Sequence, residues 1–118
     1  MNFLSQRMQS FKHAFRGILT FFRTQPNARL HLVAAILVIV LGLYVSLSPT
    51  EWMVLTGVIF LVFVTEALNT SIEFLADAFT KEHNESIKRA KDVGAGAVLL
   101  ASICAIITGL LIFLPKFL

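Results

Sequence analysis

The chain has 118 residues, of which 57% are hydrophobic and 14% are charged, whereas about a quarter of the residues in an average soluble domain are charged. The apolar residues form long blocks, which excludes a soluble globular protein and indicates one integral membrane domain, residues 1–118, with a net charge of +3. The single cysteine, Cys104, lies inside an apolar block and excludes both an intramolecular disulfide and a cysteine-based zinc site.

Residues 3–23 carry apolar side chains at alternating spacings of three and four, which places them on one stripe of a helix. The stripe consists of Leu4, Met8, Phe11, Phe15, Ile18 and Phe22. Because Lys12, Arg16 and Arg23 flank it, the segment is too charged to cross a bilayer. We expect an amphipathic helix on the cytoplasmic leaflet, and a helix packed on protein is the alternative.

Three longer apolar segments follow, and we expect Pro26 and Asn27 to separate them from the surface helix. The predicted spans cover residues 30–47, 52–78 and 93–114. Trp52 lies where an interfacial aromatic anchor belongs. The predicted fold class is therefore all-α integral membrane, with three transmembrane helices and an N-terminal amphipathic surface helix.

The basic residues are distributed unequally between the two sides of the membrane. Five precede the first span and four lie between the second and third, whereas only Lys116 remains for the other side. Since cytoplasmic loops are enriched in Lys and Arg, the N-terminus and the loop of residues 80–92 are predicted to be cytoplasmic.

The second span carries a polar stripe. Its members are Glu66, Asn69, Thr70, Glu73 and Asp77, which fall within a sector of about 80° on a helix. Counted from Trp52, Glu66 lies about 21 Å and Glu73 about 31 Å along the helix, so Glu66 is submerged in a core of roughly 30 Å. An ionised carboxylate at that depth costs at least about 2.5 kcal/mol, which indicates a function, although hydrogen-bonded helix packing is the alternative.

Glu73 and Asp77 are carboxylates one helical turn apart, a donor pair that Mg²⁺ accepts when substrate phosphates complete its coordination. Lys88, Arg89 and Lys91 reach the same membrane face, and cations beside a metal-ready acidic site suggest a polyphosphate ligand. A basic cytoplasmic loop is also what topology requires. The absence of a GxxxxGK(S/T) segment excludes a soluble nucleotide-binding fold as the source of phosphate chemistry.

Two further features allow more than one interpretation. Small residues recur on the third span at spacings of three and four, which favours close helix packing, with a passage for substrate as the alternative. His31 lies at the mouth of the first span and is interpreted as an interfacial polar side chain, with contact to a lipid head group as the alternative.

Two segments resemble motifs of the bacterial diacylglycerol kinase family. Glu66-Ala67-Leu68-Asn69-Thr70-Ser71-Ile72-Glu73 with Asp77 is similar to the first motif, and Ala90-Lys91-Asp92 is similar to the second. The resemblance extends from about Arg16 to Lys116, and the amino-acid sequence of the second half is similar to that of the undecaprenol kinase branch. It implies a homotrimer with shared active sites in the bacterial cytoplasmic (inner) membrane, which transfers the γ-phosphate of MgATP to the hydroxyl of diacylglycerol or undecaprenol.

The resemblance also implies residue roles. Glu66 corresponds to the general base and Asn69 to its orienting partner, and both would contact the lipid together with Ala95. Glu73 corresponds to the carboxylate that holds Mg²⁺. The residues that would contact ATP are Glu73, Glu82, His83, Asn84, Lys91, Asp92 and, by an approximate match, Arg7. Gln25 stands where the family usually supplies a second metal-ligating glutamate, so we expect weaker metal binding or a substitute ligand such as Asp77.

A small oligomeric membrane transporter or channel is the main rival function, because it would also explain the submerged Glu66 with Asn69. A channel has no need of Glu82 or of the pair Lys91 and Asp92. A non-catalytic assembly subunit would retain its activity after Glu66→Gln. The expected partners are a membrane lipid, ATP and two further copies of the chain, with no nucleic acid.

Overall fold

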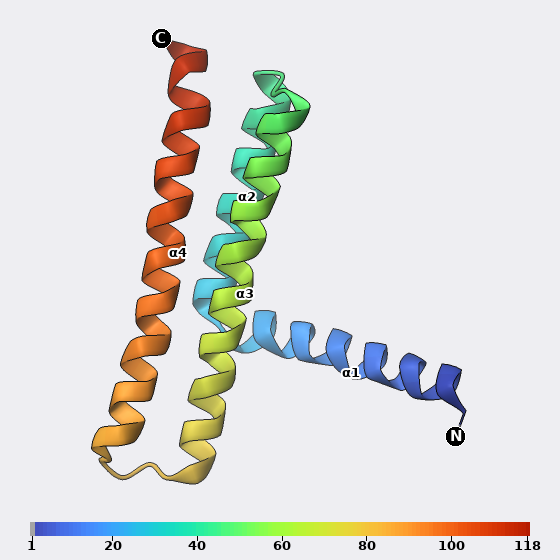
Figure 1. Ribbon diagram of the computed structural model, residues 1–118, viewed down its shortest axis with the longest axis vertical. Helices are drawn as coiled ribbons and strands as arrows, with labels where there is room; N and C mark the ends of the chain where they lie inside the picture. Colours follow the sequence, from blue (N-terminus) through green and yellow to red (C-terminus); the bar gives the residue numbers. More distant parts are fainter. Residues whose placement is uncertain (1) are drawn as a thin grey trace.

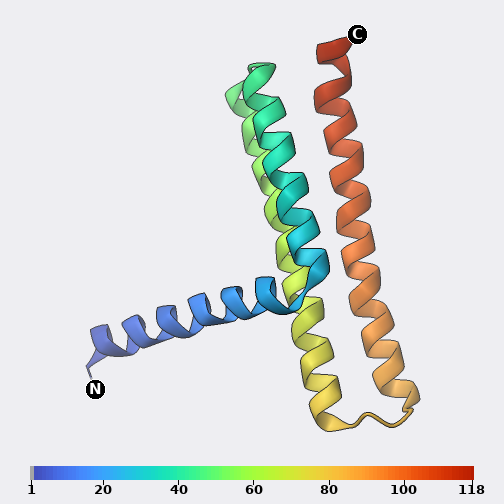
Figure 2. The ribbon, with the colours of Figure 1, turned by 180° about the vertical axis from the view of Figure 1, so that it is seen from behind.

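The structure is a computed structural model that describes residues 2–118. Its four helices are α1 (Phe3–Thr24), α2 (Pro26–Tyr44), α3 (Pro49–Phe79) and α4 (Glu85–Phe117). Helices α2, α3 and α4 run side by side with alternating direction, while α1 extends away from one side of this bundle (Figures 1 and 2). Each bundle helix is long and apolar enough to cross a membrane, which confirms the three predicted spans of a multi-pass membrane protein.

Helix α1 presents the predicted apolar stripe without covering it. Its first turn is capped by Asn2, whose Oδ1 accepts a hydrogen bond of 2.8 Å from the backbone N–H of Ser5. The side chains of Met8 and Phe15 are 72% and 68% exposed, as is typical of a helix whose apolar face requires an additional partner. That this partner is the membrane surface stays a prediction.

The helix break lies at Gln25, and Pro26 begins α2 instead of disrupting the chain further, so the first span starts before residue 30. Proline suits this position because its fixed φ matches a helix and its missing N–H is not needed in the first turn. Arg29 joins the two helices, since its Nη1 donates to the carbonyl oxygens of Phe22 and Arg23 at 2.9 Å each.

The turn between α2 and α3 is short and tightly capped. Ser46 adopts a positive φ of 56° directly after α2, which therefore ends before the predicted residue 47. Ser48 Oγ accepts from the N–H of Glu51 at 3.1 Å, and Glu51 Oε1 accepts from the N–H of Ser48 at 2.9 Å. Reciprocal bonds of this kind fix the start of a helix. Glu51 also pairs with Lys116 at 3.0 Å and so joins α3 to the end of α4.

Helix α4 begins at Glu85, eight residues before the predicted span, so most of the predicted loop of residues 80–92 is helical and only residues 80–84 connect α3 to α4. Asn84 caps the new helix start by accepting a hydrogen bond of 3.1 Å from the N–H of Ile87. Lys88 and Asp92 form an ion pair of 2.8 Å one turn apart. These residues are charged but form a helix readily, because caps and such pairs support helices outside the membrane.

Two of the small residues of α4, Gly94 and Ala101, are buried in the bundle, as close helix packing predicts, whereas Ala90 and Ala97 are exposed. Gly94 has no room for a side chain because Asn69 lies against it. At the opposite end, Gly42 is closely covered by Trp52, and Leu47, Leu55 and Ile112 form a small core. The close approach of backbones through small residues is the usual way in which helices associate in lipid.

Candidate functional site

The polar stripe of α3 is buried inside the bundle at Glu66 and becomes exposed toward the loop between α3 and α4. Glu66 and Thr70 are each only 5% exposed, Asn69 and Glu73 are half-buried, and Asp77 is exposed. Burial of the three carboxylates by protein thus decreases from Glu66 to Asp77, while their depth in the membrane stays a prediction. The two carboxylates Glu66 and Glu73 are separated by about 10 Å along the helix axis, at 1.5 Å per residue.

Glu66 pairs with a histidine from the neighbouring helix. Nε2 of His31 in α2 lies 3.1 Å from Oε1 of Glu66 in α3. From the sequence, His31 was interpreted as an interfacial polar side chain, and its contact with Glu66 was not predicted. No local sequence pattern indicates this contact, because it depends on the register of α2 against α3.

Asn69 points from α3 toward α4. Its Oδ1 is buried against Gly94 and has no hydrogen-bond partner among residues 2–118. A buried polar atom without a partner costs about 1–3 kcal/mol, so such atoms often have a ligand as their partner. The Asn69 side chain also lines an open groove of about 480 Å³ between the two helices. The walls of this groove are largely apolar, and Arg89 lines its end near the loop between α3 and α4.

The ends of α3 and α4 next to the connecting loop are joined by an ion pair. Nζ of Lys91 lies 2.7 Å from Oδ1 of Asp77, so the carboxylate that was predicted as a substitute metal ligand is paired with a cation. Glu73 lies one turn deeper and is half-buried. Residues 2–118 contain no cluster of three or more His, Cys, Asp or Glu side chains that could hold a metal ion. Because Mg²⁺ is usually held by one or two carboxylates plus phosphates, Glu73 fits a metal–nucleotide complex better than a protein-only site.

Gln25 lies at the junction of α1 and α2, at about the same depth as Glu73. From His31 back to Gln25 is about 9 Å along α2, and from Glu66 to Glu73 is about 10 Å along the antiparallel α3. The amide Nε2 of Gln25 donates to Oγ1 of Thr24 at 3.2 Å. The position of Gln25 is therefore suitable for a metal ligand near the same end of the bundle as Glu73. Its side chain is uncharged, and its role as a metal ligand stays a prediction.

The predicted nucleotide residues of the loop are exposed and have local partners. Asn84 caps α4, Nε2 of His83 lies 2.8 Å from Oε1 of Glu85, and the N–H of Glu82 donates to Oγ1 of Thr80 at 3.1 Å. The loop joins the ends of α3 and α4 that carry Asp77 and Lys91, so these residues share one end of the bundle (Figure 1).

The two remaining predicted site residues are Arg7 and Ala95. Arg7 lies on the far part of α1, where its guanidinium carbon is 5.3 Å from the centre of the Phe3 ring, and α1 extends away from the bundle (Figure 2). Ala95 is exposed on α4 beside Gly94. One chain therefore carries Glu66, Asn69 and Lys91 on the neighbouring helices α3 and α4, whereas Arg7 lies away from them.

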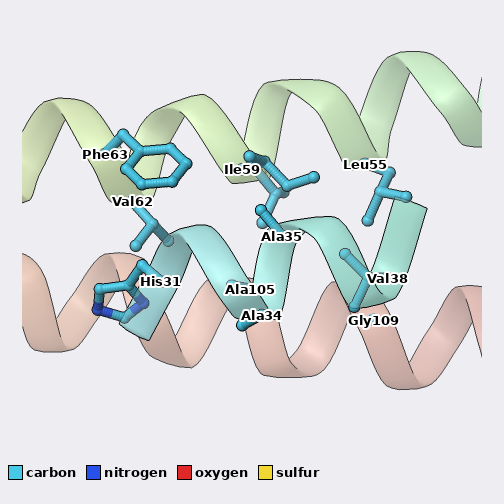
Figure 3. Close-up of a pocket in the computed structure, with 11 residues that line it drawn as sticks. His31, Ala34, Ala35, Val38, Leu55, Ile59, Val62, Phe63, Ala105 and Gly109 are labelled. Carbon is cyan, nitrogen blue, oxygen red and sulfur yellow. The ribbon is translucent and has the colours of Figure 1, made fainter. Parts of the chain in front are cut away.

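A small cavity of about 130 Å³ lies between α2, α3 and α4, next to the site. Figure 3 shows His31 at one end and Leu55 and Val38 toward the other, with Ala105 and Gly109 of α4 along the wall. Binding pockets for small molecules usually measure 300–1,000 Å³. The cavity is too small and too apolar for a nucleotide, so it does not fit the predicted nucleotide site.

Comparison with known proteins gives consistent results. The sequence model of the family described as prokaryotic diacylglycerol kinase matches residues 12–113. An undecaprenol kinase of Bacillus subtilis is 44% identical over 98% of this chain and 94% of its own length. A diacylglycerol kinase of Synechocystis is 38% identical over 92% of this chain and 63% of its own length. A diacylglycerol kinase of Escherichia coli is 31% identical, over 81% of this chain and 79% of its own length.

These relatives are named as kinases, and none of them as a transporter or channel, so the rival function has no support from the comparisons. The matches include the α3 stripe from Glu66 to Asp77 and the Lys91–Asp92 pair, because the family model extends over both segments. The chain belongs to the prokaryotic diacylglycerol kinase family.

Proposed function

We propose that this protein, a lipid kinase by family, transfers the γ-phosphate of MgATP to the hydroxyl of undecaprenol at the cytoplasmic face of a bacterial inner membrane. The observation that carries the proposal is the depth order on α3, where the buried Glu66 lies deeper than the half-buried Glu73. A lipid hydroxyl stays in the bilayer while ATP stays in water, so the base must lie deeper than the phosphate site.

The proposed mechanism assigns one task to each side chain. Glu66 accepts the proton of the lipid hydroxyl as the oxygen attacks the γ-phosphorus. Asn69, which lines the groove between α3 and α4, donates its amide N–H to the oxygen of the lipid hydroxyl and orients it. Lys91 exchanges its contact with Asp77 for the phosphates and neutralises charge as transfer proceeds. Glu73 would hold Mg²⁺, which supplies charge neutralisation at the β- and γ-phosphates when it is bound with ATP.

The choice of undecaprenol over diacylglycerol rests on the comparisons. The relative named undecaprenol kinase is 44% identical to this chain, whereas the two relatives named diacylglycerol kinase are 38% and 31% identical. The apolar walls of the α3–α4 groove beside Asn69 are compatible with either lipid, because both are largely hydrocarbon. Diacylglycerol is therefore the second acceptor to be compared in the same assay.

A homotrimer and a cytoplasmic N-terminus complete the proposal. The trimer is supported by the remote position of Arg7 and by the large apolar side chains that remain exposed on all four helices. The orientation is supported by the basic residues of α1 and of the α3–α4 segment, which face the same side of the membrane.

Phosphate transfer to lipid in mixed micelles tests the function. Purified protein with labelled MgATP should phosphorylate undecaprenol faster than diacylglycerol, and Glu66→Gln should lower kcat by about 10²- to 10⁴-fold, the usual contribution of a general base. Glu51→Gln is the matched control, because Glu51 lies on the same helix at the opposite end, 3.0 Å from Lys116. Failure of the wild type to label either lipid, or full activity of Glu66→Gln, would overturn the proposal.

A further inference from the structure

The contact between His31 and Glu66 crosses from α2 to α3 inside the bundle, and the proposed mechanism leaves His31 without a role. We infer that His31 is a positioning residue, whose imidazole N–H holds one oxygen of the Glu66 carboxylate and keeps the base oriented. The inference rests on the proposed function only in taking Glu66 as the base.

The surroundings leave Glu66 as the partner for this imidazole. The Glu66 side chain is 6% exposed and that of His31 is 28% exposed, so the acid is enclosed by protein and the histidine is partly exposed at the surface of the bundle. The cavity beside His31 is lined by apolar side chains from α3 and by Ala105 and Gly109 from α4, and His31 is its single ionisable residue (Figure 3). Neither helix therefore contributes a competing charge to the cavity.

Burial makes this contact necessary for a base. A carboxylate that has been withdrawn from water keeps its charge only when hydrogen-bond donors replace the lost water. An imidazole with its proton on Nε2 supplies such a donor at 3.1 Å from Oε1 of Glu66. The amide of Asn69 lies toward α4, whereas His31 approaches from α2, so the two residues contact different sides of the α3 stripe.

The contact also determines which oxygen can react. Oε1 of Glu66 faces His31, which leaves Oε2 to accept the proton of the lipid hydroxyl. Fixing one oxygen removes rotational freedom from the carboxylate, and a misplacement of about 1 Å at a reacting group can cost 10²-fold in rate. Loss of His31 should therefore lower kcat and leave the KM for MgATP unchanged, because the nucleotide is bound at the other end of the stripe.

Three substitutions at residue 31 separate positioning from packing. Gln places an amide N–H near the position of Nε2, Asn carries the same group on a shorter side chain, and Leu has no donor. We expect His31→Gln to retain most of the activity, and His31→Asn and His31→Leu to lower kcat by about 10- to 100-fold, with the KM for MgATP within about twofold. His13→Leu is the matched control, since His13 is exposed on α1.

A double substitution tests whether His31 acts through Glu66. The variant with both His31→Leu and Glu66→Gln should be no slower than Glu66→Gln alone, because a positioning residue has no effect once the base is absent. Additive losses would overturn the inference, as would equal losses in His31→Gln and His31→Asn. If His31→Leu does not fold, the Gln and Asn variants, compared by thermal unfolding and by kcat, still decide the outcome.

Infrared spectroscopy supplies a readout that needs no turnover. His31→Leu should shift the antisymmetric stretching band of the Glu66 carboxylate relative to the wild type, because the hydrogen bond from Nε2 is lost, and the band should be absent from the double variant. If the wild type phosphorylates no lipid and the band shifts, the proposed function fails and the contact is still shown to hold the carboxylate of Glu66. If the wild type is active and neither kcat nor the band responds to His31→Leu, the inference alone is wrong.

Discussion

Gly94 of α4 determines how Asn69 fits between the helices. Glycine at this position leaves room for the Asn69 side chain, because a Cβ built on Gly94 would overlap Oδ1 of Asn69. Asn69 in turn lies about one helical turn from Glu66, within the reach of a shared ligand. The absence of a Cβ at Gly94 therefore allows the Asn69 side chain to take its place between α3 and α4.

Gly94→Ala should consequently impair both stability and transfer. Overpacking of a close contact typically costs about 1–3 kcal/mol, more than the gain of about 1 kcal/mol from replacing glycine by alanine in a helix. The control is Gly96→Ala, because a Cβ at Gly96 meets nothing within 4 Å. Thermal unfolding and kcat with undecaprenol should both fall for Gly94→Ala alone, and equal behaviour of the two variants would contradict this account.

At the level of single residues, the sequence indicated the depth and direction of the α3 stripe because helical periodicity is a local property. The helical repeat places Glu66, Asn69 and Glu73 on one face of α3, whatever the neighbouring helices are. It did not identify His31 as the partner of Glu66, because that contact depends on the register of two helices. Register is set here by the α2–α3 turn, with Ser46 at positive φ and the capping bonds of Ser48.

At the level of elements, the start of α4 combines a structural and a predicted binding role in Asn84. Its side chain caps the helix by accepting from the N–H of Ile87, and the family resemblance predicts contact with ATP. Asn84→Ala should destabilise the protein by about 0.5–2 kcal/mol, whereas Asn84→Asp retains a capping oxygen and should not.

The substitution Asn84→Asp also distinguishes the capping role of Asn84 from its predicted contact with ATP. Because Asp adds a negative charge beside the phosphates, Asn84→Asp should raise the KM for MgATP without a change in thermal unfolding. The measurements are the unfolding temperature in detergent and the KM for MgATP at saturating lipid. An unchanged KM in Asn84→Asp would remove Asn84 from the nucleotide site and leave only its capping role.

The helix boundaries were harder to predict than the spans. Hydropathy reports where a segment can contact lipid, so it placed the third span at residues 93–114 and missed the charged first two turns of α4. Those turns are helical because Asn84 caps them and Lys88 pairs with Asp92 along the helix. Pro26 was predicted to separate the N-terminal helix from the first span, and α1 does end just before it; only the start of the span differs, because Pro26 itself occupies the first turn of α2.

At the level of the whole molecule, one chain holds only part of the proposed machinery. Glu66, Asn69, Glu73 and Lys91 lie on α3 and α4, while Arg7 lies on the far part of α1. The bundle also leaves large apolar side chains such as Leu37, Leu75 and Leu100 exposed, at 65%, 75% and 71%. Lipid covers part of this surface, and the proposed trimer would cover the rest while bringing α1 of one copy to the site of another.

Mixing two impaired variants tests that arrangement. If Arg7 of one copy serves Glu66 of another, Arg7→Ala and Glu66→Gln proteins that are co-refolded should recover activity, up to about a quarter of the wild-type rate for random trimers. The control mixes Glu66→Gln protein with Asn69→Ser protein. Glu66 and Asn69 lie one turn apart on α3, so each site takes both residues from the same chain, and no site in this mixture has both intact. Recovery in the first mixture alone, with a molecular mass of three chains, supports shared sites. No recovery, or equal recovery in both mixtures, would mean that Arg7 does not serve a neighbouring copy.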